Sequence, residues 1–226
     1  MTAKTLFSAV LLTTLISLAT PAFADNVEFI GATGAVVGNV YVAPYQLQDS
    51  GIQGGATINV ACDDFSDDVV SGETWSATTE TFDSSGVLSP GAMFAGSPDS
   101  QTNYDTAVYL YSDYLNGTAD AAGMNYAIWG IFDPSVVGGA GYESTDAAAL
   151  LAGVTLADLT GFNNYSSFGL IIPTSLGSTD GEPQEYIYST PEPSSLLLLS
   201  SGLISLAFVK RKVLQVAGTV RRNNSW

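Results

Sequence analysis

Residues 104–134, YDTAVYLYSDYLNGTADAAGMNYAIWGIFDP, decide the fold because a helical period replaces the strand-like pattern that precedes them. A first helix is predicted from apolar residues at helical spacing, namely Tyr104, Ala107, Val108, Tyr111 and Leu115. Asn116-Gly117 provides its stop. A second helix, capped by Thr118 and ended by Asp133-Pro134, is predicted from Ala121, Met124, Ala127, Ile128 and Ile131. A shorter alanine-rich helix is expected from Ser144 or Thr145 to about Ala152.

Strand-like segments lie on both sides of this helical stretch. Residues 35–42, 57–62 and 74–81 precede it, and residues 168–172 and 185–189 follow it. They are rich in Val, Ile, Tyr, Trp and Thr and are separated by Gly, Asp and Ser clusters. The order predicts an α+β domain over residues 25–189, a β-rich sandwich or barrel with a helical insert.

The first 24 residues have the features of a secretory signal peptide. Lys4 forms a short basic region, residues 6–18 are apolar, and Thr20-Pro21 interrupts the run. Ala22 and Ala24 are small residues at the two positions that signal peptidase reads, which predicts cleavage between Ala24 and Asp25.

Residues 194–209 are uncharged and rich in Leu, and a basic cluster, Lys210-Arg211-Lys212, follows them. This pattern predicts a single transmembrane helix with the basic cluster in the cytoplasm. Residues 213–226 would then form a cytoplasmic tail. Because the signal peptide exports the amino-terminal side, the domain is expected outside the inner membrane.

Pro191-Glu192-Pro193 stands directly before the apolar run. The order of tripeptide, apolar helix and basic cluster over residues 190–212 resembles the PEP-CTERM sorting signal that exosortases recognise in Gram-negative bacteria. The resemblance implies that an exosortase-like membrane peptidase processes the chain near the tripeptide. It also implies an inner-membrane precursor and delivery to the cell surface or the extracellular polysaccharide matrix.

All charged side chains of the predicted domain are acidic. All Asp and Glu residues of the chain except Glu192 lie between Asp25 and Thr190, and that segment has no Lys, Arg or His. Nucleic acid and anionic lipid should therefore be repelled. Without His, neither a Ser-His-Asp triad nor an ordinary zinc site can form in this segment, so we expect a non-enzymatic protein.

Carboxylates nevertheless offer three alternatives. Asp63, Asp64, Asp67 and Asp68 form a cluster that either binds Ca²⁺ or is a solvated acidic turn. Carboxylate pairs with Trp75, Trp129 and the many tyrosines as sugar platforms are the pattern of a glycoside hydrolase. Asp49-Ser50-Gly51 has the same sequence as the aspartic-protease tripeptide, but a turn is the simpler interpretation.

The only cysteine, Cys62, lies in Ala61-Cys62-Asp63, and Asn125 opens the run Asn125-Tyr126-Ala127-Ile128-Trp129. This pair of motifs resembles the thioester domains of bacterial surface adhesins, in which a Cys and the Gln of a Gln-x-Ala-Ile-Trp motif are joined. Asn125 stands where that Gln would be. The alternative interpretation is a buried, inert Cys62 and an ordinary helix core. We thus expect a structural or adhesive surface protein, with a thioester-like or carbohydrate-binding adhesin as the alternative.

Overall fold

The computed structural model describes residues 25–52, 55–83, 88, 90–138, 144–178 and 182–190. The chain divides into two compact units, Met1–Ser189 and Thr190–Trp226. The predicted signal peptide, transmembrane helix and cytoplasmic tail lie outside the described residues. Among the residues that are described, no helix combines the length and apolar character that a membrane span requires.

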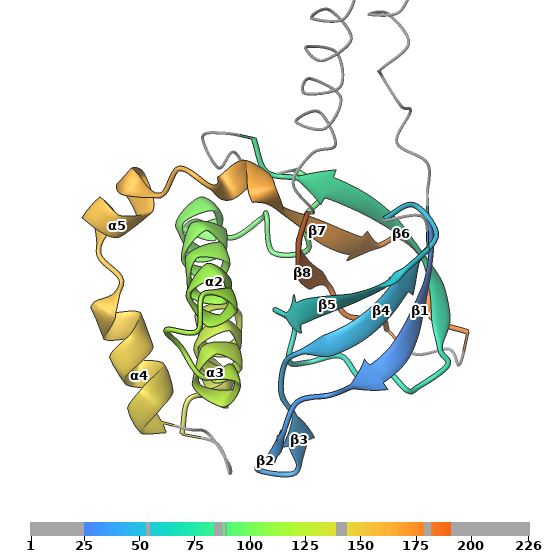
Figure 1. The fold of residues 1–226 in the computed structure, drawn as a ribbon, viewed down its shortest axis with the longest axis horizontal. Helices are drawn as coiled ribbons and strands as arrows, with labels where there is room; N and C mark the ends of the chain where they lie inside the picture. The colour runs from blue at the N-terminus through green and yellow to red at the C-terminus, as the bar shows by residue number, and fades with distance from the viewer. Residues whose placement is uncertain are drawn as a thin grey trace, which may run out of the picture. The chain divides into compact units, whose positions relative to one another are not determined.

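The core of the domain is a closed antiparallel barrel (Figure 1). Its strands, in order around the barrel, are β1 (Asp25–Ala32), β4 (Tyr45–Asp49), β5 (Thr57–Cys62), β8 (Tyr186–Ser189), β7 (Phe168–Pro173) and β6 (Thr74–Thr81). Closure pairs every strand on both sides, so the barrel leaves no open edge. The predicted mixture of strands and helices around a barrel core is therefore confirmed.

Two parts of the strand prediction were incomplete. Residues 35–42 form a hairpin of β2 (Val36–Val37) and β3 (Val40–Tyr41), not one strand. Gly38 and Asn39 both have positive φ values, 60° and 68°, which are the backbone conformations that a two-residue hairpin turn requires. Strands β1 and β4 were missed, although β4 alternates buried and less buried side chains as a half-buried strand should.

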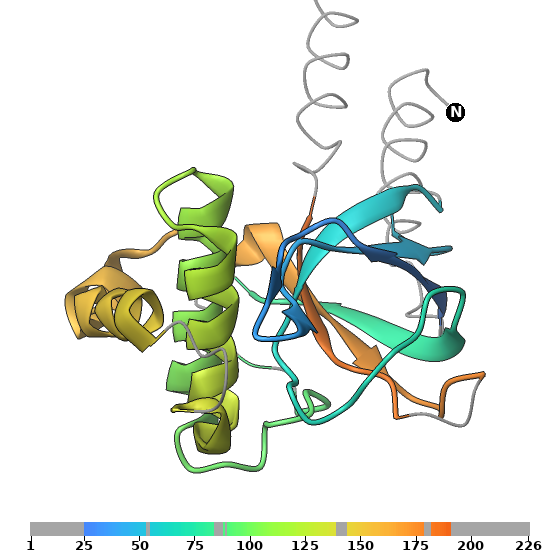
Figure 2. The ribbon, with the colours of Figure 1, turned by 90° about the horizontal axis from the view of Figure 1, so that it is seen from below.

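The helical layer lies between β6 and β7 in sequence and packs on one side of the barrel. It comprises α2 (Ser100–Leu115), α3 (Ala121–Phe132), η2 (Pro134–Val136), α4 (Ser144–Gly153), α5 (Leu156–Gly161) and η3 (Tyr165–Ser167). Figures 1 and 2 show α2 and α3 against the barrel, with α4 and α5 on their outer side. Helix α3 is buried continuously from Gly123 to Trp129 because it packs against both β5 and α4.

The boundaries of α2 and α3 follow local chemistry. Gly117, with φ of 74°, lies just beyond the end of α2, as the Asn-Gly stop predicted. The expected cap of α3 was wrong by two residues: Asp120, not Thr118, accepts a hydrogen bond from the Gly123 amide at 2.8 Å. The Thr118 hydroxyl instead donates to the Asp113 carbonyl of α2, so it closes the preceding turn.

The Asp49-Ser50-Gly51 segment is a turn, as expected. The Asp49 Oδ1 atom accepts hydrogen bonds from the Gly51 amide at 2.7 Å and from the Ile52 amide at 3.1 Å. These bonds from a carboxylate to its own downstream backbone are typical of an Asx-turn. Asp49 therefore has a local structural role at the end of β4.

Candidate functional site at the junction of barrel and helices

Strand β5 delivers Cys62, Asp63 and Asp64 to the junction between barrel and helices, and all three are buried. The register of β5 against β8 places Cys62 opposite Tyr186. The next pair, directly beyond these two strands, is Asp63 and Glu185. The Asp63 amide donates a hydrogen bond to the Glu185 carbonyl at 3.5 Å. An acidic pair is thus brought inside because the barrel closes at this point.

Asn125 links helix α3 to two segments of the barrel. Its Oδ1 atom accepts a hydrogen bond from the Ala43 amide at 2.7 Å, and its Nδ2 atom donates to the Cys62 carbonyl at 3.2 Å. Asn125 and Cys62 are fully buried. The structure therefore brings together the two residues that the adhesin resemblance singled out. The hydrogen bond joins the Asn125 amide to the main chain of Cys62, not to its thiol.

The thiol of Cys62 lies in a setting that keeps it protonated. Burial, and then the negative charges of Asp63 and Asp64, raise its pKa well above the ordinary value. The Trp129 side chain and the Asp64 backbone act in the opposite direction and lower this pKa. The thiol donates a hydrogen bond to the Asp64 carbonyl at 2.8 Å. A neutral, buried thiol is a poor nucleophile.

The buried carboxyl groups of Asp63 and Glu185 form a second polar element of the junction. The Tyr104 hydroxyl donates to one oxygen of Glu185, and the Met93 amide donates to the other at 2.8 Å. Neither carboxyl oxygen of Asp63 accepts a hydrogen bond from any donor among the described residues. Burial, followed by the charge of Glu185, raises the pKa of Asp63 far above its usual range.

Burial beside the Glu185 carboxyl group therefore favours the protonated, neutral form of Asp63. Two facing carboxylates without a proton would repel each other in a medium of low dielectric. Sequence reasoning missed Glu185 because its partner lies on a distant strand and its local context is unremarkable. Its place as the first residue of the predicted strand at residues 185–189 was the only signal available.

The four aspartates considered as a calcium site differ in how deeply they are buried. Asp63 and Asp64 are buried, Asp67 is half-buried and Asp68 is exposed. Within the described part of the chain, no group of three or more Asp, Glu, Cys or His side chains is placed to hold a metal ion. The Asp64 carboxylate instead accepts a hydrogen bond from the Ser66 amide at 2.9 Å.

The loop that carries these aspartates is fastened to β8 by Gln184. The Gln184 Nε2 atom donates to the carbonyls of Asp64, at 3.0 Å, and Asp67. Its Oε1 atom accepts a hydrogen bond from the Tyr186 hydroxyl at 2.9 Å. These hydrogen bonds hold the loop in a defined position next to the start of β8.

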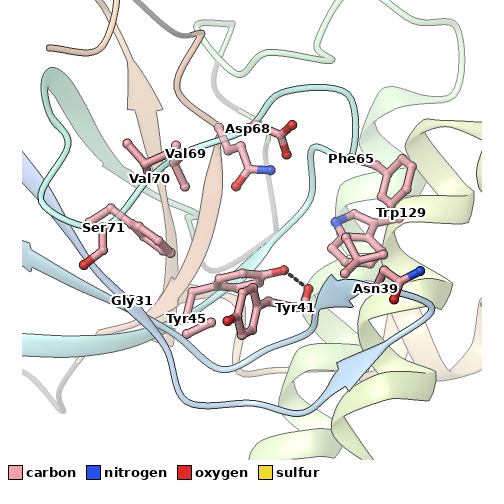
Figure 3. Close-up of a pocket in the computed structure, with 14 residues that line it drawn as sticks. Gly31, Asn39, Tyr41, Tyr45, Phe65, Asp68, Val69, Val70, Ser71 and Trp129 are labelled. Carbon is pink, nitrogen blue, oxygen red and sulfur yellow. Dashed lines mark hydrogen bonds between the residues drawn. The ribbon is translucent and has the colours of Figure 1, made fainter. Parts of the chain in front are cut away.

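A cavity of about 530 Å³ opens beside this loop (Figure 3). In the figure, Tyr41 and Tyr45 form one side, Phe65 and Trp129 form another, and Asp68 lies across from the tyrosines. The walls come from the β2–β3 hairpin, β4, the acidic loop and α3. Aromatic walls with a few polar groups at a cavity of this size are typical of a small-ligand site.

Of the aromatic residues considered as sugar platforms, Trp75 and Trp129 are buried. Their exposed fractions are 2% and 1%. Trp75 stacks on Tyr186 with ring centroids 6.3 Å apart, and Trp129 packs edge-on against Phe65 at 5.0 Å. Tyr41, which is 57% exposed, is the open aromatic side chain at the cavity. Its position just after the Gly38-Asn39 turn was the sequence signal for exposure.

Comparison with known proteins identifies one segment. The model of the PEP-CTERM protein-sorting motif matches residues 189–212, and this match confirms the sorting resemblance. The chain therefore carries the sorting signal of exported proteins that exosortases process. Searches of curated proteins and of solved structures found no match.

Proposed function

We propose that this chain is an exported precursor whose acidic domain has a structural or adhesive role at the cell surface or in the extracellular polysaccharide matrix. The main support for this proposal is the sorting motif at residues 189–212. Strand β8 ends at Ser189, where that motif begins. A cut within or after the tripeptide Pro191-Glu192-Pro193 would therefore leave every strand of the barrel in the released protein.

The domain acts, in this proposal, without catalysis. The carboxyl pair that the fold brings together, Asp63 and Glu185, is fully buried, so water and a glycoside cannot enter between the two groups. The Cys62 thiol is held neutral, and no Lys, Arg or His lies between Asp25 and Thr190 to activate it. These features support binding or structure as the role of the domain.

The first test is the fate of the carboxy-terminal segment. With one tag inside the domain and another after Trp226, immunoblots of fractionated cells should detect only the domain tag on the surface form. Replacing Pro191-Glu192-Pro193 with three alanines should trap a longer form in the inner membrane, because the basic cluster opposes passage through the bilayer.

The matched control is a triple-alanine replacement of Gly96-Ser97-Pro98, which lie in an exposed loop of the domain. This variant should be sorted as the unaltered chain is. Detection of both tags on the mature surface protein would contradict exosortase processing and would indicate a permanently anchored protein.

A second candidate function is a thioester adhesin, and the contact between Asn125 and Cys62 favours it. The Ala43 amide donates to the Asn125 Oδ1 atom, where negative charge would develop during attack on the amide. The Cys62 sulfur would form a bond to Cγ of Asn125 and the C–N bond would break. The amide nitrogen, with the thiol proton, would leave as ammonia.

We expect Cys62 to remain a free thiol, because burial and the adjacent carboxyl groups disfavour the thiolate. Intact mass should equal that of the unmodified chain, and iodoacetamide should react only after denaturation. Cys62→Ala provides the labelling control. A mass deficit of one ammonia that methylamine reverses would instead establish the thioester.

A further inference from the structure

The cavity beside the acidic loop has a preorganised rim. The Tyr45 hydroxyl donates to the Tyr41 carbonyl at 2.5 Å, which fixes the end of the hairpin (Figure 3). Gln184 holds the loop that leads to Asp68 through the carbonyls of Asp64 and Asp67. Because both sides are held by the barrel, little ordering is needed when a ligand enters, and that favours binding.

The charge at this rim is uncompensated. The Asp68 side chain is exposed and lines the cavity. No Lys, Arg or His occurs anywhere between Asp25 and Thr190. A cleft lined by one sign of charge concentrates the field and attracts the opposite charge. Phosphate, sulfate and carboxylate ligands are therefore disfavoured here, and an ammonium group is favoured.

The aromatic walls add a second requirement. Tyr41 offers an open ring, and Phe65 is partly exposed beside Trp129. Aromatic faces bind the apolar faces of flat or ring-shaped ligands, and they also attract cations. A ligand that combines a ring with an ammonium group would use both the walls and Asp68.

We propose that this cavity binds an amino sugar whose amino groups are free, as found in a deacetylated polysaccharide. The proposal rests on the proposed function, in which the released domain meets extracellular polysaccharide. The sugar ring lies on Tyr41, and its ammonium group pairs with the Asp68 carboxylate. Acetylation removes the charge and adds bulk, so an acetylated sugar loses the interaction that gives specificity.

The test uses the full chain, purified in an uncharged detergent, and isothermal titration calorimetry. The probes are the glucosamine tetramer and the N-acetylglucosamine tetramer, compared at about pH 6, where the amine of the first is largely protonated. The glucosamine tetramer should bind about tenfold more tightly or better, a factor that corresponds to 1.4 kcal/mol. Added salt should weaken its binding, because the pair at Asp68 is solvent-exposed.

Three variants locate the site. Asp68→Asn should weaken binding of the glucosamine tetramer about fivefold, as expected for an exposed ion pair. Tyr41→Leu should also weaken it, because the leucine keeps apolar surface but removes the ring. Asp99→Asn removes the same charge from an exposed position outside the cavity and should leave the affinity unchanged. Thermal unfolding of each variant verifies the fold.

Each other result overturns the proposal. Equal affinity for the two tetramers would indicate a site for neutral sugar, and no binding of either would exclude the ligand class. Equal weakening by Asp68→Asn and Asp99→Asn would show general attraction between a polycation and an acidic protein. None of these results affects the two-tag sorting assay, so the proposed function is tested separately.

Discussion

Acidification from about pH 8 to about pH 5 is expected to raise the melting temperature of the domain, because several carboxyl groups bind a proton more readily in the folded state than in the unfolded state. Burial raises the pKa of Asp67 to about 6, with a further contribution from Asp64. Burial likewise raises the pKa values of other carboxyl groups, namely Asp49, Asp63, Asp105 and Glu185.

The direction of this pH dependence follows from the number of protons bound in the folded and unfolded states. Between an unfolded pKa of about 4 and a raised folded pKa, the folded protein holds more protons, so the free energy of unfolding falls as pH rises. A fully buried group such as Asp63 contributes up to about 1.4 kcal/mol per pH unit in that window. Protonation also reduces repulsion in a chain with a formal net charge of −16.

Two carboxyl groups act in the opposite direction. Hydrogen bonds from Ser135 and from Thr155 lower the pKa values of Asp133 and Asp158, respectively. Their stabilisation is present above the unfolded pKa and is lost as pH falls below about 4. The melting temperature should therefore pass through a maximum in mildly acidic solution, and calorimetry across the pH range measures it.

Asp63→Asn tests the origin of this pH dependence. Asparagine is neutral at every pH and places no negative charge beside Glu185. The variant should therefore be more stable than the unaltered domain at about pH 8, and the gain should shrink as pH falls. Asp99→Asn, at an exposed carboxyl group, is the control. If the melting temperatures of Asp63→Asn and of the unaltered domain changed in parallel across the pH range, the titration of Asp63 would not be the origin of the pH dependence.

Removal of the Asn125 side chain is expected to be the most destabilising polar substitution in the domain. Asn125→Ala leaves the Ala43 amide and the Cys62 carbonyl buried without these partners. Each unsatisfied buried group costs about 1–3 kcal/mol, so the free energy of unfolding should fall by about 2–6 kcal/mol. Chemical denaturation measures the loss.

Asn163→Ala, at an exposed position in the loop after α5, is the matched control and should change the free energy of unfolding by less than about 0.5 kcal/mol. If Asn125→Ala were equally mild, the link from α3 to the barrel would not be a source of stability. The result also bears on the adhesin resemblance, because it measures what Asn125 contributes without a thioester.

The sequence alone determined the features that depend on neighbouring residues. The sorting motif is an order of tripeptide, apolar run and basic cluster, and the family comparison matches it over residues 189–212. Helices α2, α3 and α4 and strands β5, β6, β7 and β8 were predicted from periodicity and stops. These patterns extend over a few neighbouring residues, so they can be recognised in the sequence without knowledge of tertiary contacts.

Only the tertiary structure decided which polar residues meet and which aromatic side chains stay open. Glu185 faces Asp63 because β8 closes the barrel against β5, and Asn125 reaches Cys62 because α3 packs on that strand. Tyr41 is exposed while Trp129 is buried, although both are aromatic residues at one cavity. Burial depends on segments far apart in the sequence, whereas periodicity reports only one element at a time.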